Sequence, residues 1–168
     1  MRLRSIERYD AVDLFILTEA GETTGQGIGS MNYTADDILS LIDAELKSGQ
    51  MRSAVIERLS DDALIGIISV NAHTYDCVDI AYFMKAELRR QGYMREALQA
   101  YCAYVFSRCA VSRIIAQYRT DNEASAALLR SCGFRKTDIT QLLMNDYKYH
   151  EAITCCLTKD EFKIGGII

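Results

Sequence analysis

A long run of apolar residues at helical spacing marks the centre of this chain. Three β-rich stretches, at 52–59, 64–71 and 77–84, come before it, and four residues separate the first two. A meander of antiparallel strands followed by one long helix is the economical arrangement of these segments. The apolar residues that recur every three or four positions, over about four turns, are Ala97, Leu98, Tyr101, Cys102, Val105, Phe106 and Cys109.

Weaker patterns on both sides complete the order of elements. We expect a strand at 2–9 and a helix around 12–17, then a glycine-rich loop at 21–29 and a helix from Thr34 to Gly49. After the long helix we expect a strand at 113–118, a helix at 124–132 closed by Gly133, and strands at 135–144 and 149–157. This order predicts one mixed α/β (α+β) domain over residues 1–168, which is long enough for one sizeable core.

The composition excludes several classes of function. The chain has 19 basic and 23 acidic side chains, a net charge of -4 and no long basic cluster, so we expect no nucleic-acid partner and favour a cationic one. Its six cysteines form no C-x-x-C pair and only two histidines accompany them, so we expect no metal and reduced thiols. No apolar run reaches the ~20 residues that a membrane span needs, so we expect no membrane contact and a cytoplasmic protein.

The junction between the third β-rich stretch and the long helix carries the first chemical signal. Arg89, Arg90 and Gly92 stand in a turn at the start of the helix. Backbone N–H groups point outward at a helix N-terminus and favour an anion, and glycine lets a phosphate approach the backbone closely. The turn therefore predicts an anion site, although a solvated basic turn explains the same residues equally well.

A second segment follows about thirty residues later, after another strand. Asn122 and Ser125 open a short helix, and Gly133-Phe134 follow its end. Local rules for helix caps explain this segment by itself. Only its combination with the preceding anion turn, in this order and spacing, is specific.

These two segments resemble the cofactor motifs of the GNAT superfamily of N-acetyltransferases. The turn Arg89-Arg90-Gln91-Gly92-Tyr93-Met94 is similar to the acyl-CoA pyrophosphate loop, whose pattern is R/Q-x-x-G-x-G/A, and Asn122-x-x-Ser125 with Gly133-Phe134 is similar to the second CoA-side motif. The form of the second motif resembles the ribosomal-protein-alanine N-acetyltransferase branch. Further similarities to this branch, in the right order along nearly the whole chain, are Leu3-Arg4 with Asp10, Ile65-Gly66, Asp79-Ile80-Ala81-Tyr82 and Leu157-Thr158.

The resemblance implies a fold and a cofactor site. The fold would be a mostly antiparallel sheet of about seven strands, splayed between strands 4 and 5 and flanked by about four helices, with acetyl-CoA in the gap. The pyrophosphate would meet the backbone N–H groups of Arg89, Arg90, Gln91, Gly92, Tyr93 and Met94. Pantetheine would pair with the strand that ends at Phe83-Met84, and Asn122 and Ser125 would lie beside its amides or the thioester.

Two positions depart from the family pattern. Met94 stands where the loop pattern has Gly or Ala, so its side chain either points away from the pyrophosphate or narrows its seat. Leu129 stands where many members carry a tyrosine that protonates the departing thiolate. Candidates for that acid in this chain are Tyr82, Tyr118, Tyr147 and Tyr149.

The resemblance implies transfer of an acetyl group from acetyl-CoA to a primary amine by direct attack on the thioester. Asp79 matches the glutamate of the branch and is the candidate base, with Glu57 as the alternative and an exposed carboxylate without a role as the competing interpretation. Ser125 is either a catalytic hydroxyl or a small packing residue. A non-catalytic CoA-binding regulatory domain is the alternative function.

The choice of acceptor follows from the amine pKa. An α-amino group with a pKa of about 7.7 to 8.0 is partly neutral at cellular pH, whereas a lysine at about 10.4 needs a stronger base. We therefore expect a peptide N-terminus or a small-molecule amine as the acceptor, with the glycine-rich loop and the helix from Thr34 beside it. The protein is expected to be a monomer or a homodimer.

Overall fold

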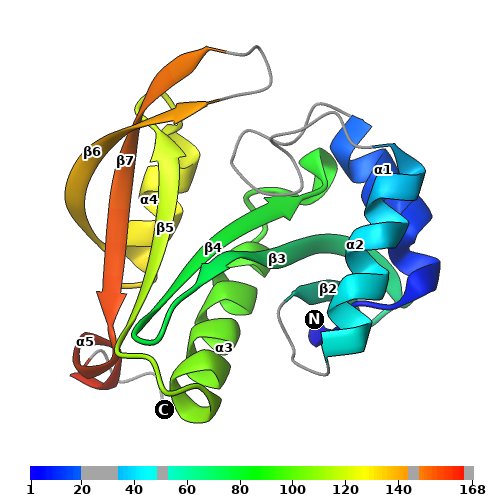
Figure 1. Cartoon of the computed structure of the whole chain (residues 1–168), viewed down its shortest axis with the longest axis horizontal. Coiled ribbons are helices and arrows are strands. Elements are labelled where there is room, and N and C mark those ends of the chain that lie inside the picture. Colours follow the sequence, from blue (N-terminus) through cyan, green and yellow to red (C-terminus); the bar gives the residue numbers. More distant parts are fainter. Residues whose placement is uncertain (20–33, 49–52, 144–147, 165–168) are drawn as a thin grey trace.

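The computed structural model describes residues 1–19, 34–48, 53–143 and 148–164, which form a seven-stranded sheet with helices on both faces (Figure 1). The strand order is β1-β2-β3-β4-β5-β7-β6, in which only the β4–β5 pair is parallel. The predicted mixed α/β architecture is therefore confirmed. The strands are β1 (Arg2–Ser5), β2 (Ala54–Arg58), β3 (Ala63–His73), β4 (Cys77–Met84), β5 (Arg113–Arg119), β6 (Arg135–Leu143) and β7 (Tyr149–Thr158).

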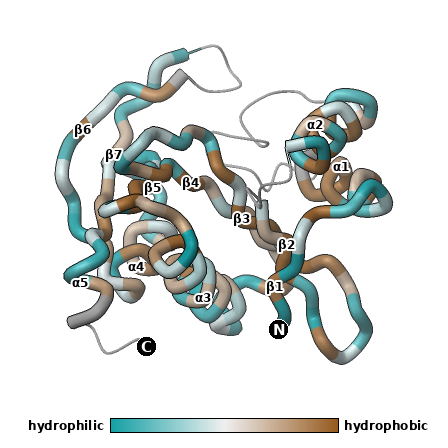
Figure 2. Tube along the Cα trace, turned by 60° about the horizontal axis from the view of Figure 1, so that its bottom comes forward, coloured by the Kyte–Doolittle hydropathy of each residue, from teal (hydrophilic) through white to brown (hydrophobic). Residues whose placement is uncertain are grey.

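Two pairs of helices cover opposite faces of the sheet (Figure 2). The first pair buries an apolar cluster against β2, β3 and β4, and the second pair buries a larger cluster on the other face. A short helix after β7 was not predicted from the sequence. The helices are α1 (Ala11–Glu19), α2 (Ala35–Ser48), α3 (Tyr93–Arg108), α4 (Glu123–Ser131) and α5 (Lys159–Ile164), with 3-10 turns η1 (Arg8–Asp10) and η2 (Ala86–Leu88).

The sheet splits between β4 and β5. Register pairs join the two strands from Cys77 opposite Arg113 to Ile80 opposite Ala116, and no pair follows. Beyond this point β4 runs on to Met84 and β5 to Arg119 while the two strands diverge (Figure 1). The expected splay between strands 4 and 5 is confirmed, and it opens toward the N-terminus of α3.

Helix caps explain where two of the predicted helices begin and end. The Thr34 N–H and hydroxyl both donate to Asp37 Oδ2, at 2.8 and 2.7 Å, so this pair caps α2 as its spacing predicts. At the end of α4, Gly133 has φ 88°, and Phe134 N–H donates to the Leu129 carbonyl at 3.0 Å. This is the αL termination that a glycine at this position favours. The predicted loop at 21–29 lies outside the described residues.

A charge network fastens β1 to its surroundings. The Arg4 guanidinium donates to both oxygens of Asp10, at 2.7 and 2.8 Å, and its Nε donates to Glu57 at 2.5 Å. Arg2 also pairs with Glu57. Asp10 and Glu57 are only 1% and 4% exposed, so both carboxylates depend on these arginines. The predicted strand at 2–9 ends at Ser5, before the turn that carries Asp10.

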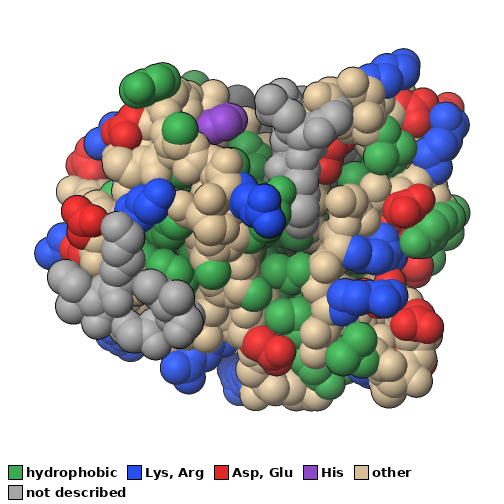
Figure 3. Space-filling view, turned by 90° about the horizontal axis from the view of Figure 1, so that it is seen from below, with side chains coloured by type: hydrophobic (Ala, Val, Ile, Leu, Met, Phe, Trp, Pro, Cys, Tyr) green, Lys and Arg blue, Asp and Glu red, His purple; other side chains and the backbone are tan. Residues whose placement is uncertain are grey.

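The surface carries mixed charges (Figure 3) and the cysteines are not paired. On the face in Figure 3, hydrophobic side chains gather near the middle and both signs of charge are interspersed toward the edges. All six cysteines are free, and Cys155 is buried in the core while its neighbour Cys156 is partly exposed on the other face. Among the described residues, no group of His, Cys, Asp or Glu is arranged to hold a metal ion, and no helix has the length and hydropathy to cross a membrane.

Candidate active site

A cleft of about 970 Å³ lies where β4 and β5 part. Its wall combines the second half of β4, the turn before α3, the first turn of α3, the end of β5 and the start of α4. Nine of the residues predicted to bind CoA line it, and Gln91 does not. The nine are Phe83, Met84, Arg89, Arg90, Gly92, Tyr93, Met94, Asn122 and Ser125.

The turn before α3 has the geometry of an anion site. Arg90 and Gly92 both have positive φ, 60° and 89°, and Gly92 caps α3. The Glu96 N–H donates to the Gly92 carbonyl at 3.0 Å, so the helix starts directly after this glycine. The N–H groups of the first turn have no partner within their own helix and point toward the cleft end of α3. The turn therefore offers several donors and a positive helix terminus to an anion.

Side chains around the turn hold it against β4. Arg89 Nε donates to the Met84 carbonyl at 3.2 Å, which ties the turn to the end of the strand. The Gln91 side chain donates instead to the Glu87 carbonyl at 3.0 Å and is exposed. The prediction that Gln91 lines the cofactor site therefore extends only to its backbone, because its side chain is engaged with η2.

Met94 belongs both to the wall of the cleft and to the edge of the core. Its side chain is half-buried and packs against the large apolar cluster under the sheet. A methionine at the second helical position thus contributes to the core, and its N–H stays at the helix N-terminus. With methionine at this position, Gly92 still caps α3.

The start of α4 forms the opposite wall. Asn122 caps the helix, and its Oδ1 accepts the Ser125 N–H at 3.0 Å. The Ser125 side chain is 8% exposed, and its hydroxyl is hydrogen-bonded to the Tyr82 hydroxyl from β4. Burial raises the pKa of Tyr82, so this phenol stays protonated. A hydroxyl pair therefore joins β4 to the first turn of α4 in the wall of the cleft.

Asp79 lies one residue before the cleft-lining segment of β4, on the face that α1 and α2 cover farther along. The side chain is half-buried, and its Oδ1 is buried with no hydrogen-bond partner. Burial raises the pKa of Asp79 to about 6, and hydrogen bonding from Asn71 acts in the opposite direction. Asp79 is thus not the exposed strand-edge carboxylate of the competing interpretation.

The alternative base does not reach the cleft. Arg4 and Arg2 bind Glu57, and the Arg4 hydrogen bond holds the pKa of this carboxyl below its ordinary value. A carboxylate in such a network is a poor proton acceptor. Glu57 is a structural residue of the β1–β2 pair, and the spacing of the sequence gave no sign of its partners.

Of the candidate acids, Tyr82 and Tyr118 line the cleft; Tyr118 is buried and Tyr82 is half-buried. Tyr149 is 70% exposed on β7, and Tyr147 lies outside the described residues. Leu129 is fully buried in the core. Sequence reasoning missed the contribution of Asn71, which also lines the cleft, because no local pattern marks it.

Comparisons with known proteins agree with this geometry. The acetyltransferase (GNAT) domain family matches residues 1–135. An uncharacterized N-acetyltransferase of Bacillus subtilis (strain 168), YoaA, is 31% identical over 148 residues, which cover 84% of this chain and 83% of the relative.

Solved structures share the fold at low sequence identity. A spermidine N-acetyltransferase from Vibrio cholerae, in complex with CoA and spermine, superposes with a TM-score of 0.83 at 17% identity and covers 96% of this chain and 97% of its own. A ribosomal-protein-S5-alanine acetyltransferase from Vibrio fischeri gives a TM-score of 0.76 at 21% identity, over 95% and 93% of the two chains. Together with the family match and the split sheet, these findings show that the chain belongs to the GNAT acetyltransferases and is an N-acetyltransferase.

Proposed function

We propose that this enzyme transfers the acetyl group of acetyl-CoA to a primary amine of modest pKa, either a protein N-terminal α-amine or a small-molecule amine. The observation that carries the proposal is the half-buried carboxylate of Asp79 at the point where the sheet splits, beside a cleft that ends at an anion-binding turn. A candidate base beside a cleft, with an anion site in the wall of the same cleft, suits a thioester donor with a charged tail.

The cleft suits acetyl-CoA at each of its ends. The N–H groups from Arg89 to Met94 would receive the pyrophosphate at the N-terminus of α3. β4 has no β5 partner beyond Ile80, so its edge facing β5 from residue 81 to Met84 is open to the amides of pantetheine. Bound acetyl-CoA would supply the activated acetyl group and a thiolate leaving group.

The pKa of the amine decides how much its deprotonation by this base costs. A carboxylate with a pKa of about 6 lies roughly 2 units below an α-amine, and removing that proton costs about 2.5 kcal/mol. A lysine side chain lies roughly 4.4 units above the same base, at a cost of about 6 kcal/mol. The difference, about 3.5 kcal/mol, is more than two orders of magnitude in the neutral amine available for attack.

The hydroxyl pair of Tyr82 and Ser125 is suited to the leaving group. Both residues line the cleft, and Tyr82 stays protonated because burial disfavours its anion. We assign Ser125 as the hydroxyl nearest to the thioester, with Tyr82 as its hydrogen-bond partner. Either hydroxyl can donate to a developing thiolate, which is the stabilisation that acyl transfer requires.

Calorimetric titration of acetyl-CoA into the reduced protein tests the first half of the proposal. Micromolar binding is expected, and absence of binding would refute a CoA enzyme. Transfer is then compared by mass spectrometry for a peptide with an N-terminal alanine, for spermidine and for a lysine whose α-amine is acetylated and whose side-chain amine is free. The first two are chosen because neighbours of this fold are named for an S5 alanine and for spermidine. Binding without transfer to any amine would favour the non-catalytic CoA-binding domain.

The Asp79→Asn variant tests the base. It should keep the acetyl-CoA affinity of the wild type and lose the acid limb of its pH–rate profile, because it removes the group that titrates near pH 6. The Asp138→Asn variant is a matched control, since Asp138 is an exposed carboxylate on β6. An unchanged profile in Asp79→Asn would remove this residue as the base.

A further inference from the structure

A bulge in β3 lies directly beside the candidate base. Val70 pairs with Ile80 and Ala72 pairs with Asp79, so Asn71 is an extra residue between two consecutive positions of β4. A bulge redirects the side chain of the extra residue and is common beside active sites. Here it occurs at the two positions of β4 that end the pairing with β5.

The bulge places Asn71 beside both the cleft and Asp79. Asn71 is exposed and lines the cleft, and the register places it next to Ala72, the partner of Asp79, so its amide lies beside the Asp79 carboxylate that it influences. Because Asp79 Oδ1 is buried without a partner, the second carboxylate oxygen is the one left for the amide and the cleft. Without Asn71, burial would raise the pKa of the Asp79 carboxyl with no opposing influence from this amide.

Resting on the proposed role of Asp79 as base, we propose that Asn71 is a positioning residue that keeps the Asp79 carboxylate ionised and directed at the split. It acts through Asp79 and need not touch the acetyl group. A purely structural asparagine in the bulge would influence stability and leave the titration of Asp79 unchanged. The two roles therefore differ in a pH-dependent readout.

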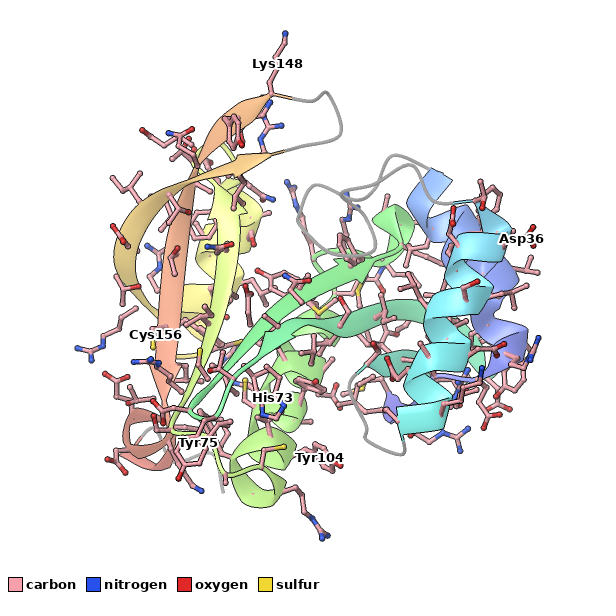
Figure 4. All side chains as sticks on the ribbon, viewed as in Figure 1. Asp36, His73, Tyr75, Tyr104, Lys148 and Cys156 are labelled. Atoms are coloured by element: carbon pink, nitrogen blue, oxygen red, sulfur yellow. The ribbon has the colours of Figure 1, made fainter. Side chains whose placement is uncertain are left out.

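Other ionisable groups near Asp79 have to be separated from this effect. Cys77 is two residues away on β4, and Arg113 pairs with it from β5. Cys156 of β7 lies in the same cross-strand row, through Ile115 (Figure 4). On β3, His73 is exposed and lies where β3 turns into β4 (Figure 4), opposite Val78. Of these groups, His73 is the histidine on the bulged strand itself, two residues after Asn71, so its variant is the necessary control.

The experiment measures kcat/KM for the amine against pH in the wild type, Asn71→Ala, Asn71→Gln and His73→Ala. Loss of one hydrogen bond to the carboxylate should move the acid limb up by about one pH unit. For Asn71→Ala this means roughly fivefold lower kcat/KM at pH 6 and a nearly unchanged value at pH 8.5, with acetyl-CoA affinity unchanged. Asn71→Gln, which keeps an amide, should restore part of the shift, and His73→Ala should show none.

Titration of the Asp79 carboxyl by carbon-13 NMR in the free protein gives a readout that does not depend on catalysis. The Asn71→Ala variant should raise the midpoint of this titration, and an unchanged midpoint would overturn the inference even if the enzyme is active. If Asp79→Asn keeps the acid limb while the NMR midpoint moves in Asn71→Ala, the coupling stands and the assignment of the base fails. If the NMR midpoint moves and the acid limb does not, Asn71 has no part in the reaction.

Discussion

Gly92 allows the anion turn to be tested by one methyl group. Its φ of 89° is in the left-handed region, and a Cβ built at this position meets no atom within 4 Å. The Gly92→Ala variant therefore introduces backbone strain without a steric clash. Placing alanine in this conformation costs about 1 to 2 kcal/mol. For a chain of this size the melting temperature should fall by about 2 to 8 °C.

Gly133 provides a matched control for the same strain. It has φ 88°, and its added Cβ would lie at an ordinary 3.5 Å from Leu157 Cδ1. Gly133→Ala should lose a similar amount of stability at the end of α4, away from the anion turn. If the turn of Gly92→Ala relieves its strain by leaving the binding geometry, acetyl-CoA affinity should fall by about five- to thirtyfold.

Thermal unfolding and calorimetric titration of both variants decide the matter. Equal losses of affinity in the two variants would mean that strain anywhere in this domain weakens binding. Unchanged affinity in Gly92→Ala, with the expected loss of stability, would show that the turn does not receive the pyrophosphate. Either result would refute the reasoning from backbone geometry.

Three further perturbations follow from the packing. Gly66→Ala should destabilise the fold, because its Cβ would lie 2.5 Å from a backbone oxygen of β4, and urea unfolding should show a lower midpoint. Arg4→Ala should cost about 3 kcal/mol, since it leaves buried Asp10 without its cation. Arg4 lowers the pKa of Glu57, so the stability that this pair contributes is fully present above the ordinary pKa of a glutamate. It is lost as the pH falls through the lowered pKa, so the free energies of unfolding of the wild type and Arg4→Ala should approach each other in acid. Ser69→Ala removes a buried hydroxyl that has no partner and should leave the melting temperature equal or higher.

Local patterns predicted the elements that carry the cofactor end of the site. The helical spacing from Ala97 onward, the turn at Gly92 and the cap at Asn122 depend on residues close in sequence, and α3 and α4 follow them closely. The first of these helices begins at Tyr93, directly after the glycine that the pattern marks. The elements that line the cleft at the start of α3 and α4 were therefore accessible from the sequence.

The surroundings of the two candidate bases were not accessible, because they depend on the register of the strands. Whether Asn71 faces the cleft is decided by a bulge that shifts β3 by one position against β4, and no local rule marks that shift. Likewise, Glu57 meets Arg2 and Arg4 across more than fifty residues of sequence. The residues next to a carboxylate in the sequence of a strand do not reveal whether a distant arginine binds it or burial raises its pKa.

The short parallel seam between β4 and β5 has a consequence for how the enzyme holds together. Four register pairs join the half-sheet β1-β2-β3-β4 to the half-sheet β5-β7-β6. A ligand that lies in the gap and touches both half-sheets acts as an additional link between them, so saturation with acetyl-CoA at a hundredfold excess over Kd should add about 2.7 kcal/mol to the stability. Amide hydrogens on the facing edges of β4 and β5 should then both exchange more slowly in the complex than in the free protein. Bound acetyl-CoA would in this way stabilise the contact between the two half-sheets.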